Sequence, residues 1–193
     1  MPPPSRREHL VDTAIALFSE YGFHATGIDT ILGRAGVSKK TLYRYFRSKD
    51  ELILAALRKY DGLFRNSFMR QIEERADTPR DRLVALFDVA EHWFSQNNFY
   101  GCMFINAAGE YSDTSAPVRE VCRDFKAMIR SYILTLCERA GAADPPMLAD
   151  ELSLLLEGAT VTAQVSQDGT RAARTAKTAA IALINQALAD APG

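Results

Sequence analysis

The chain has 193 residues, enough for one domain of ordinary size or for a small domain joined to a larger one, and its 47% hydrophobic content is ample for a packed core. The formal net charge of -1 argues against a protein that coats nucleic acid without regard to its sequence. No apolar run approaches the roughly 18 residues of a membrane-spanning helix, and the N-terminus lacks the apolar core of a signal peptide, so we expect a cytoplasmic protein without membrane contact.

Helical periodicity dominates the sequence, and the sustained two-residue alternation of half-buried strands is absent. We therefore predict an all-α protein of about nine helices. The first helix is predicted over residues 5–21, where apolar residues recur at three- and four-residue steps until Gly22. The second is predicted to begin after Thr26 and to end at Gly36. The Thr26 side chain can cap its N-terminus, and the Asp29 side chain can return a hydrogen bond to the main chain of Thr26.

The third helix is predicted to begin after Ser38 and to be only two turns long. Ser48 and Glu51 form an S-x-x-E pattern, which predicts a capping box at the start of a much longer fourth helix. Further helices are predicted from Pro79, in the segment CMFINAA, from Pro117, after DPP and after QDG. Three short helices before the long one, with a tight glycine-containing turn between the second and the third, are typical of a helix-turn-helix domain.

The third helix carries the residues that point to a function. Leu42 and Phe46 are four residues apart and are predicted to face the core. The far side and the flanks carry cations and tyrosines, namely Lys40, Tyr43, Arg44, Tyr45 and Arg47. Lysines in the first turn of a helix are unfavourable, because their positive charge opposes the helix macrodipole. Such an unfavourable residue is expected where function rather than stability determines the sequence. Such a helix fits the major groove of DNA, where Lys and Arg read guanine edges and Tyr contacts phosphate or thymine methyl groups.

The distribution of charge supports this interpretation. Residues 1–60 carry ten Lys or Arg and six Asp or Glu, a formal +4, whereas the rest of the chain carries -5. The alternative is that the charges of the third helix are only a solvated face. Their single sign, the interleaved tyrosines and their place in the second helix of the pair favour contact with double-stranded DNA instead.

The segment TGIDTILGRAGVSKKTLYRYFRSKDEL, residues 26–52, resembles the DNA-binding signature of tetracycline-repressor-type (TetR-family) regulators. The resemblance covers about residues 8–55. It implies that Lys39, Lys40 and Arg44 face bases, and that the backbone of DNA is held or flanked by Thr41, Tyr43, Tyr45 and Lys49. Thr26 and Gly27 belong to the same predicted site, although Gly27 departs from the Ser or Thr often found beside the cap.

The resemblance further implies a homodimer, with a helix-turn-helix domain at 1–48, a connector helix at 49–75 and a ligand-binding and dimerisation domain at 76–193. One recognition helix covers about half a turn of duplex, so specific binding needs two copies on a near-palindrome. The last two helices are candidates for the contact between the two subunits, because small side chains let helices of two subunits approach closely. Their apolar faces mix Leu with the small residues Gly158, Ala159, Ala163, Ala176, Ala180 and Ala187. The alternative is that these helices are only intrachain core.

Repression is expected because it is the commonest mode in the family, with release by a small molecule bound in the acidic body. Aromatic and sulfur-containing residues of the middle helices favour a largely apolar ligand, with Asn106 as a polar group that could orient it. Each of these residues, taken singly, is more often plain core than pocket. The candidate ligand-binding residues are Trp93, Phe94, Phe99, Cys102, Met103, Asn106, Phe125 and Met128.

Two other functions compete with this interpretation. An enzyme is disfavoured, because none of the G-x-S-x-G, H-E-x-x-H, phosphate-loop or dinucleotide patterns occurs; we predict no catalytic residue, cofactor or metal site. A regulator that senses oxidation would use Cys102, Cys122 or Cys137. Cys122 and Cys137 are about 22 Å apart on one predicted helix, too far for a bridge, which leaves Cys102 as the partner. Reduced structural thiols are the favoured interpretation.

Overall fold

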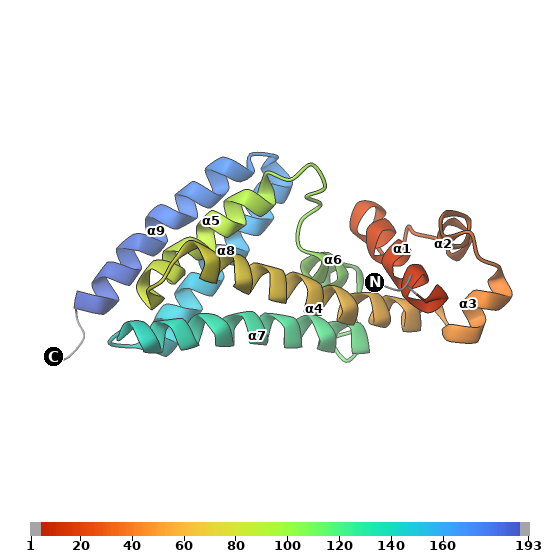
Figure 1. Cartoon of the computed structure of the whole chain (residues 1–193), viewed down its shortest axis with the longest axis horizontal. Helices are drawn as coiled ribbons and strands as arrows, with labels where there is room; N and C mark the ends of the chain where they lie inside the picture. The colour runs from red at the N-terminus through yellow and green to blue at the C-terminus, as the bar shows by residue number, and fades with distance from the viewer. Residues whose placement is uncertain (1–4, 190–193) are drawn as a thin grey trace. The chain divides into compact units, whose positions relative to one another are not determined.

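The computed structural model describes residues 5–189, and within this range the chain forms nine α-helices (Figure 1). The predicted all-α fold is confirmed. The helices are α1 (Arg6–Tyr21), α2 (Ile28–Ala35), α3 (Lys39–Tyr45), α4 (Lys49–Arg75), α5 (Pro79–Phe94), α6 (Met103–Glu110), α7 (Pro117–Ala140), α8 (Pro145–Ser166) and α9 (Gly169–Ala189). None of the described helices is both long and apolar enough to cross a membrane.

The described residues fall into two compact units, and two helices are shared between them. The first unit holds the residues up to Phe64 together with Met103–Phe125, so it contains α1 to α3, α6 and the first parts of α4 and α7. The second unit holds Arg65–Cys102 and the residues from Lys126 onwards, which include α5, α8 and α9. The middle helix α6 therefore belongs with the helix-turn-helix elements rather than with α5, α8 and α9.

α1 begins with a complete capping box that the sequence interpretation did not single out. The Ser5 hydroxyl accepts the N–H of Glu8 at 3.2 Å, and the Glu8 carboxylate accepts the N–H of Ser5 at 2.7 Å. These bonds lower the pKa of Glu8, because they favour its charged form. α1 ends as predicted at Gly22, whose φ of 85° suits a residue without a β-carbon.

The predicted cap of α2 is wrong. The N-cap residue is Gly27, which makes no side-chain cap, and Thr26 is only 2% exposed. The Thr26 hydroxyl donates to the carbonyl of Gly22 at 2.6 Å and lies 3.3 Å from that of Leu17. Its hydroxyl therefore ties the turn back onto α1, and α2 begins without a side-chain acceptor. Gly36 ends α2 in the left-handed conformation, as predicted.

The cap and the inward face of α3 are confirmed. The Ser38 hydroxyl accepts the N–H of Thr41 at 3.2 Å. Leu42 is fully buried, and Phe46, the residue that ends the helix, is 3% exposed. Two large apolar side chains thus anchor a helix of seven residues to the unit beneath it.

The predicted capping box at the start of α4 forms only in part. The Ser48 hydroxyl accepts the N–H of Glu51 at 3.2 Å, as expected. The Glu51 carboxylate accepts the N–H of Arg47 at 2.7 Å, so the returning bond reaches one residue further back than a capping box requires. The two bonds still attach residues 47 and 48 of the connection to the first turn of α4.

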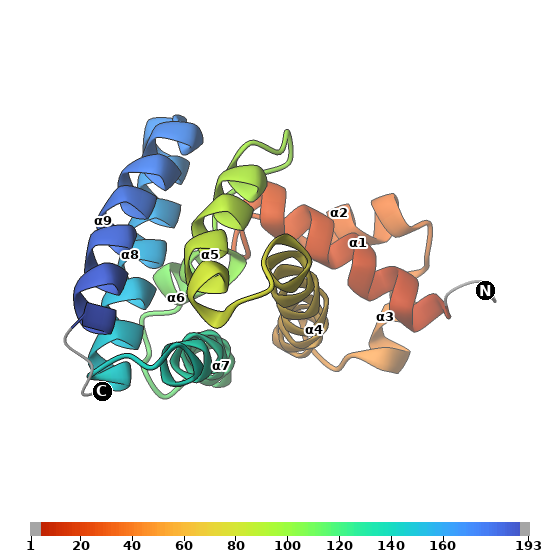
Figure 2. The ribbon, with the colours of Figure 1, turned by 60° about the vertical axis from the view of Figure 1, so that its left-hand side comes forward.

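In the second unit, α9 packs against α8 and α5, and the three helices lie side by side (Figures 1 and 2). Small side chains allow α8 and α9 to approach each other closely. The buried small residues of these helices include Ala159, Ala163, Ala176 and Ala180. Ion pairs between α5 and α9 flank it, with Lys177 Nζ 2.6 Å from Asp88 and Arg174 Nε 3.0 Å from Glu91. These alanines therefore serve packing within the chain.

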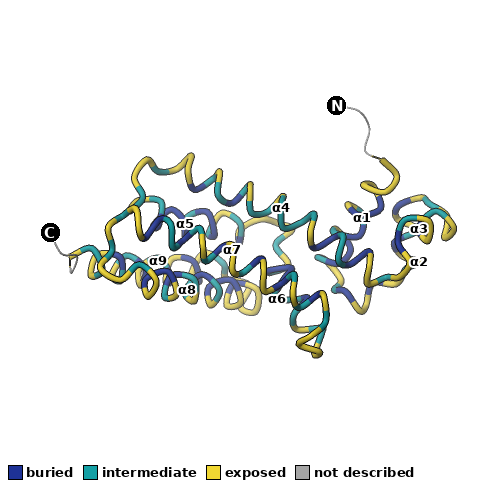
Figure 3. Tube along the Cα trace, turned by 90° about the horizontal axis from the view of Figure 1, so that it is seen from below, coloured by how far each residue is buried: buried dark blue, intermediate teal, exposed yellow. Residues whose placement is uncertain are grey.

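α8 also keeps an apolar stripe on its outer side. Leu154 is 75% exposed, Val161 is 42% exposed and Val165 is 78% exposed. The spacing of these residues, with exposed Gly158 between the first two, places them on one face of the helix. Buried residues recur with the helical period along α8 and α9, and Figure 3 shows buried and exposed residues on both helices.

Candidate nucleic-acid interface

The outward face of α3 carries the predicted cations. Lys39, Lys40, Tyr43 and Arg44 are exposed, whereas Leu42 between them is buried. Because α3 has no acidic residue, neither lysine of its first turn has a carboxylate neighbour on its own helix. The helix dipole is therefore opposed by two solvated ammonium groups, which an anionic partner would neutralise.

Thr41 and Tyr45 are half-buried, and each contacts a polar side chain nearby in the sequence. The hydroxyl oxygens of Thr41 and Ser38 lie 2.9 Å apart, at the start of the helix. At its end, Arg44 donates from Nη2 to the Tyr45 hydroxyl at 2.7 Å. The polar edges of the outward face are thus ordered by contacts within α3 and with its N-cap residue.

Lys49 opens α4 and is half-buried. Its Nζ donates to the carbonyl oxygen of His24 at 3.2 Å, so the side chain reaches toward the turn between α1 and α2. Gly27, at the start of α2, is exposed. The predicted residues Lys49 and Gly27 are thereby brought to the helix-turn-helix from outside α3, while the side chain of Thr26 is buried in its interior.

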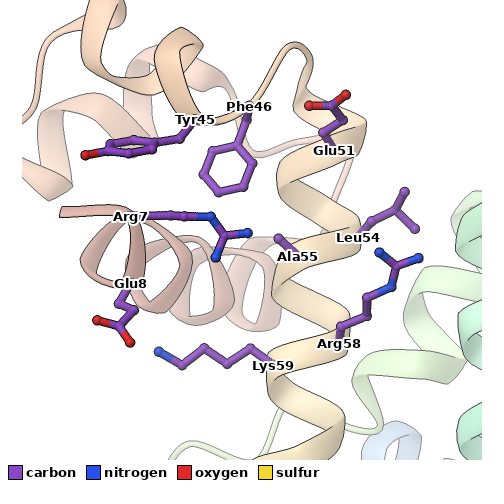
Figure 4. Close-up of a pocket in the computed structure, with 9 residues that line it drawn as sticks. All are labelled: Arg7, Glu8, Tyr45, Phe46, Glu51, Leu54, Ala55, Arg58 and Lys59. Atoms are coloured by element: carbon purple, nitrogen blue, oxygen red, sulfur yellow. The ribbon is translucent and has the colours of Figure 1, made fainter. Parts of the chain in front are cut away.

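A groove of about 750 Å³ lies beside this surface, between α1, the end of α3 and α4 (Figure 4). Arg7 extends over the ring of Phe46 at 5.2 Å from its centroid, and Lys59 Nζ is 2.6 Å from the Asp12 carboxylate. Arg58 and Tyr45 also line the groove. Three cations, Arg7, Arg58 and Lys59, line the groove together with the carboxylates of Glu8 and Glu51. The sequence analysis did not find this groove, because the residues that line it come from helices far apart in the sequence.

The candidate ligand-binding residues are divided between the two units. Met103, Asn106 and Phe125 lie in the first unit, where Phe125 stacks on Phe104 with the ring centroids 3.8 Å apart. Tyr60 and Phe64 of α4 extend this aromatic cluster. Phe104 and Phe125 are nearly fully buried, so these two rings pack on each other as core.

The remaining candidates lie in the second unit. Trp93, Phe94 and Phe99 form a cluster in which the ring centroids are 5.1 to 5.4 Å apart. Cys102 is buried, and Met128 is 41% exposed. Each unit thus has its own group of aromatic side chains.

The three cysteines are buried thiols. Cys102 and Cys122 are each 5% exposed, and Cys137 is fully buried. Burial raises the pKa of Cys137 to about 12, so the sulfur stays protonated at neutral pH. This state is that of an inert structural thiol rather than a reactive one. Within residues 5–189, no three His, Cys, Asp or Glu side chains are grouped so as to hold a metal ion.

Comparison with known proteins agrees with this geometry. Residues 10–56 match the family described as bacterial regulatory proteins, tetR family, and residues 79–179 match the tetracyclin repressor-like C-terminal domain. The first match contains the whole of α2 and α3, and the second runs from the start of α5 into α9. The two matches together include the candidate interface and most of the second unit.

Individual relatives regulate transcription in both directions. The chain is 37% identical to the HTH-type transcriptional activator FasR of Mycolicibacterium smegmatis over 64% of its own length and 58% of that protein. It is 26% identical to the HTH-type transcriptional repressor NemR of Escherichia coli, over 83% of its own length and 85% of that protein.

A solved structure also resembles nearly the whole chain. The TetR-family transcriptional regulator SCO4454 from Streptomyces coelicolor superposes with a TM-score of 0.88 at 26% identity, covering 95% of this chain and 96% of that one. The family is one of transcription regulators rather than enzymes. The chain belongs to the tetR family of bacterial regulatory proteins and is a DNA-binding transcriptional regulator.

Proposed function

We propose that this regulator is a repressor, that it binds a near-palindromic operator as a homodimer, and that a small, largely apolar effector releases it. The observation that carries the proposal is the outward face of α3, where four cationic or aromatic side chains are exposed over a buried Leu42. A short helix anchored in this way can enter the major groove of DNA without moving its own core.

In this proposal, Lys39, Lys40 and Arg44 read base edges, because Lys and Arg hydrogen-bond to guanine O6 and N7. The phosphate backbone is contacted by Thr41, Tyr43, Tyr45 and Lys49, with Gly27 offering main-chain groups at the start of α2. The side chain of Thr26 is left out, since its hydroxyl is buried and engaged within the unit.

The homodimer is proposed to form through the outer stripe of α8, with α9 beside it. Leu154, Val161 and Val165 give this stripe an apolar surface that is unusual for a solvated helix. Exposed Gly158 on α8 and exposed Ala182 on α9 would allow a partner helix to approach closely. The alanines first considered for the contact, such as Ala159 and Ala180, are buried in the chain's own packing and have no part in it.

Repression is supported by the extent of the similarity. The match to the repressor NemR runs over 83% of the chain, whereas the match to the activator FasR runs over 64%. An apolar effector is supported by the aromatic cluster of Trp93, Phe94 and Phe99, in which Trp93 and Phe99 are only half-buried. The buried thiols give no support to an oxidation-sensing regulator.

The deciding experiment is selection of bound sequences from a randomised duplex pool, followed by gel shifts of the selected duplex at two salt concentrations. We expect a near-palindrome bound by two chains, with affinity that falls as salt rises but stays above that for random DNA. A pool without consensus, and binding lost between about 50 and 200 mM salt, would reduce α3 to a non-specific cationic patch. A reporter gene placed behind the selected duplex then distinguishes repression from activation.

A further inference from the structure

The C-terminal end of α6 is tied to the turn between α1 and α2. Glu110, the last residue of α6, accepts the N–H of Phe23 on Oε1 at 2.9 Å and the N–H of His24 on Oε2 at 2.6 Å. Its Oε2 is also 3.2 Å from His24 Nδ1. Gly22 makes room for this carboxylate, since a β-carbon there would lie 2.9 Å from Oε1. One side chain thus satisfies two main-chain donors that neither α1 nor α2 can pair.

The next residue, Tyr111, reaches the start of α4. Its hydroxyl donates to Asp50 Oδ1 at 3.1 Å, and its ring centroid lies 5.2 Å from that of His24. Burial, and then the hydrogen bond to Asp50, raise the pKa of Tyr111, so its hydroxyl remains a donor at neutral pH. Adjacent residues of one segment therefore hold both the turn before α2 and the first turn of α4.

Lys49 lies between these two attachments. Its Nζ donates to the carbonyl oxygen of His24 at 3.2 Å, so the main chain of His24 is bound by Glu110 at its N–H and by Lys49 at its C=O. An ammonium group has three N–H donors, which leaves two for a phosphate when one is directed to His24. The position of Lys49 thereby depends on residues some sixty positions further along the chain.

We propose that Glu110 and Tyr111 form a latch that positions Lys49 for contact with a DNA phosphate. The proposal rests on the proposed function, in which Lys49 is a backbone contact. Glu110 fixes the carbonyl that Lys49 binds, and Tyr111 fixes the helical turn from which Lys49 projects. A lysine held in this way loses less side-chain freedom when it binds DNA than a free surface lysine does.

The experiment uses the full chain and the selected operator. Tyr111→Phe removes one hydroxyl and keeps the ring, and Glu110→Gln keeps the size of the side chain but replaces one acceptor oxygen with an NH₂ group. Each is measured alone and with Lys49→Ala, over a range of salt concentrations. Glu120→Gln, the same change of charge at an exposed residue of α7 in the same unit, is the matched control.

We expect Tyr111→Phe and Glu110→Gln each to weaken operator binding about 3- to 10-fold, the size of one lost hydrogen bond. The salt dependence should fall toward that of Lys49→Ala, which lacks about one phosphate contact. Neither substitution should weaken binding further once Lys49 is alanine, and Glu120→Gln should leave both affinity and salt dependence close to those of the wild type.

A purely structural role gives a different result. A substitution that only lowers the folded fraction reduces the apparent affinity at every salt concentration and leaves the salt slope unchanged, and thermal unfolding measures that fraction directly. Losses that are unchanged in the Lys49→Ala background, or an unchanged slope, would overturn the latch while the wild type still selects an operator. A wild type that selects no operator would remove the proposed function itself, and the latch with it.

Discussion

The guanidinium group of Arg44 lies over the ring of Tyr45, 4.9 Å from its centroid, and donates to the Tyr45 hydroxyl at 2.7 Å. The two residues are neighbours on α3, and the contact joins an exposed arginine to a half-buried tyrosine. An arginine stacked in this way keeps its planar donors ordered, which favours bidentate contact with a guanine.

Arg44→Ala is therefore expected to cost about 1–3 kcal/mol of binding free energy on the operator and to relax the sequence preference. Lys49→Ala is the comparison, since loss of a phosphate contact should weaken all sequences alike and lower the salt slope by about one. Dissociation constants on the selected duplex and on a scrambled one, at several salt concentrations, measure both effects. Equal losses for the two variants on both duplexes would show that Arg44 does not read bases.

The second prediction concerns the outer stripe of α8. Leu154→Glu places a charge on a side chain that is 75% exposed, so the chain should fold while the proposed dimer contact is lost. We expect the dimer dissociation constant to rise at least about tenfold, or 1.4 kcal/mol, together with weaker operator binding. Light scattering on a sizing column measures the mass. Leu63→Glu makes the same change at a leucine that is 58% exposed on α4, and it should stay dimeric; monomers from both variants would contradict the assignment.

The third prediction concerns stability. Gly169 begins α9, and a β-carbon there would lie 2.5 Å from Phe94 Cβ and 3.2 Å from the Phe94 carbonyl oxygen. Because main-chain atoms must shift, Gly169→Ala should lower the free energy of unfolding by about 1–3 kcal/mol. Gly62→Ala, within α4 and with no such neighbour within 4 Å, should instead raise it by about 0.5–1 kcal/mol. Urea denaturation tests the pair, and an unchanged midpoint for Gly169→Ala would refute the close packing of α9 on α5.

The fourth prediction concerns Cys137 and pH. Burial raises the pKa of its thiol from 9.0 to about 12, so the folded chain binds this proton more tightly than the unfolded chain does. The stability that Cys137 contributes is thus complete below pH 9.0 and is lost as the pH rises toward 12. The difference in unfolding free energy between the wild type and Cys137→Ala should shrink over that range. At neutral pH an alkylating reagent should label Cys137 only in denaturant, as mass spectrometry would show; prompt labelling of the folded chain would contradict its burial.

Much of the fold follows from signals that are local in the sequence. The end of α1 at Gly22, the cap of α3 at Ser38 and the inward side chains of α3 were all predicted, because each depends on residues within about one turn of helix. The cationic face of α3 was predicted for the same reason, since the helical period alone places Arg44 opposite Leu42.

The tertiary structure decided which residue caps α2 and which face of α8 and α9 is buried, where the local sequence allows more than one answer. Thr26 has the chemistry of a helix cap, but its hydroxyl finds the carbonyls of Gly22 and Leu17 inside the unit, and Gly27 takes the capping position instead. The small residues of α8 and α9 face the chain's own core at Ala159 and Ala180, and this left Leu154 on the outside. Periodicity cannot choose between two faces that are both apolar, because burial depends on what packs against each face.

The attachment of Glu110 to the turn before α2 lay beyond any sequence pattern. The carboxylate and the N–H of His24 are 86 positions apart, and a single Glu after an apolar segment has no local signature. Hydrogen bonds between distant segments form where folding has already excluded water from unpaired main-chain groups. The sequence by itself determined the helices and the chemistry of the outward face of α3, whereas only the tertiary structure decided which side chains hold that face in place.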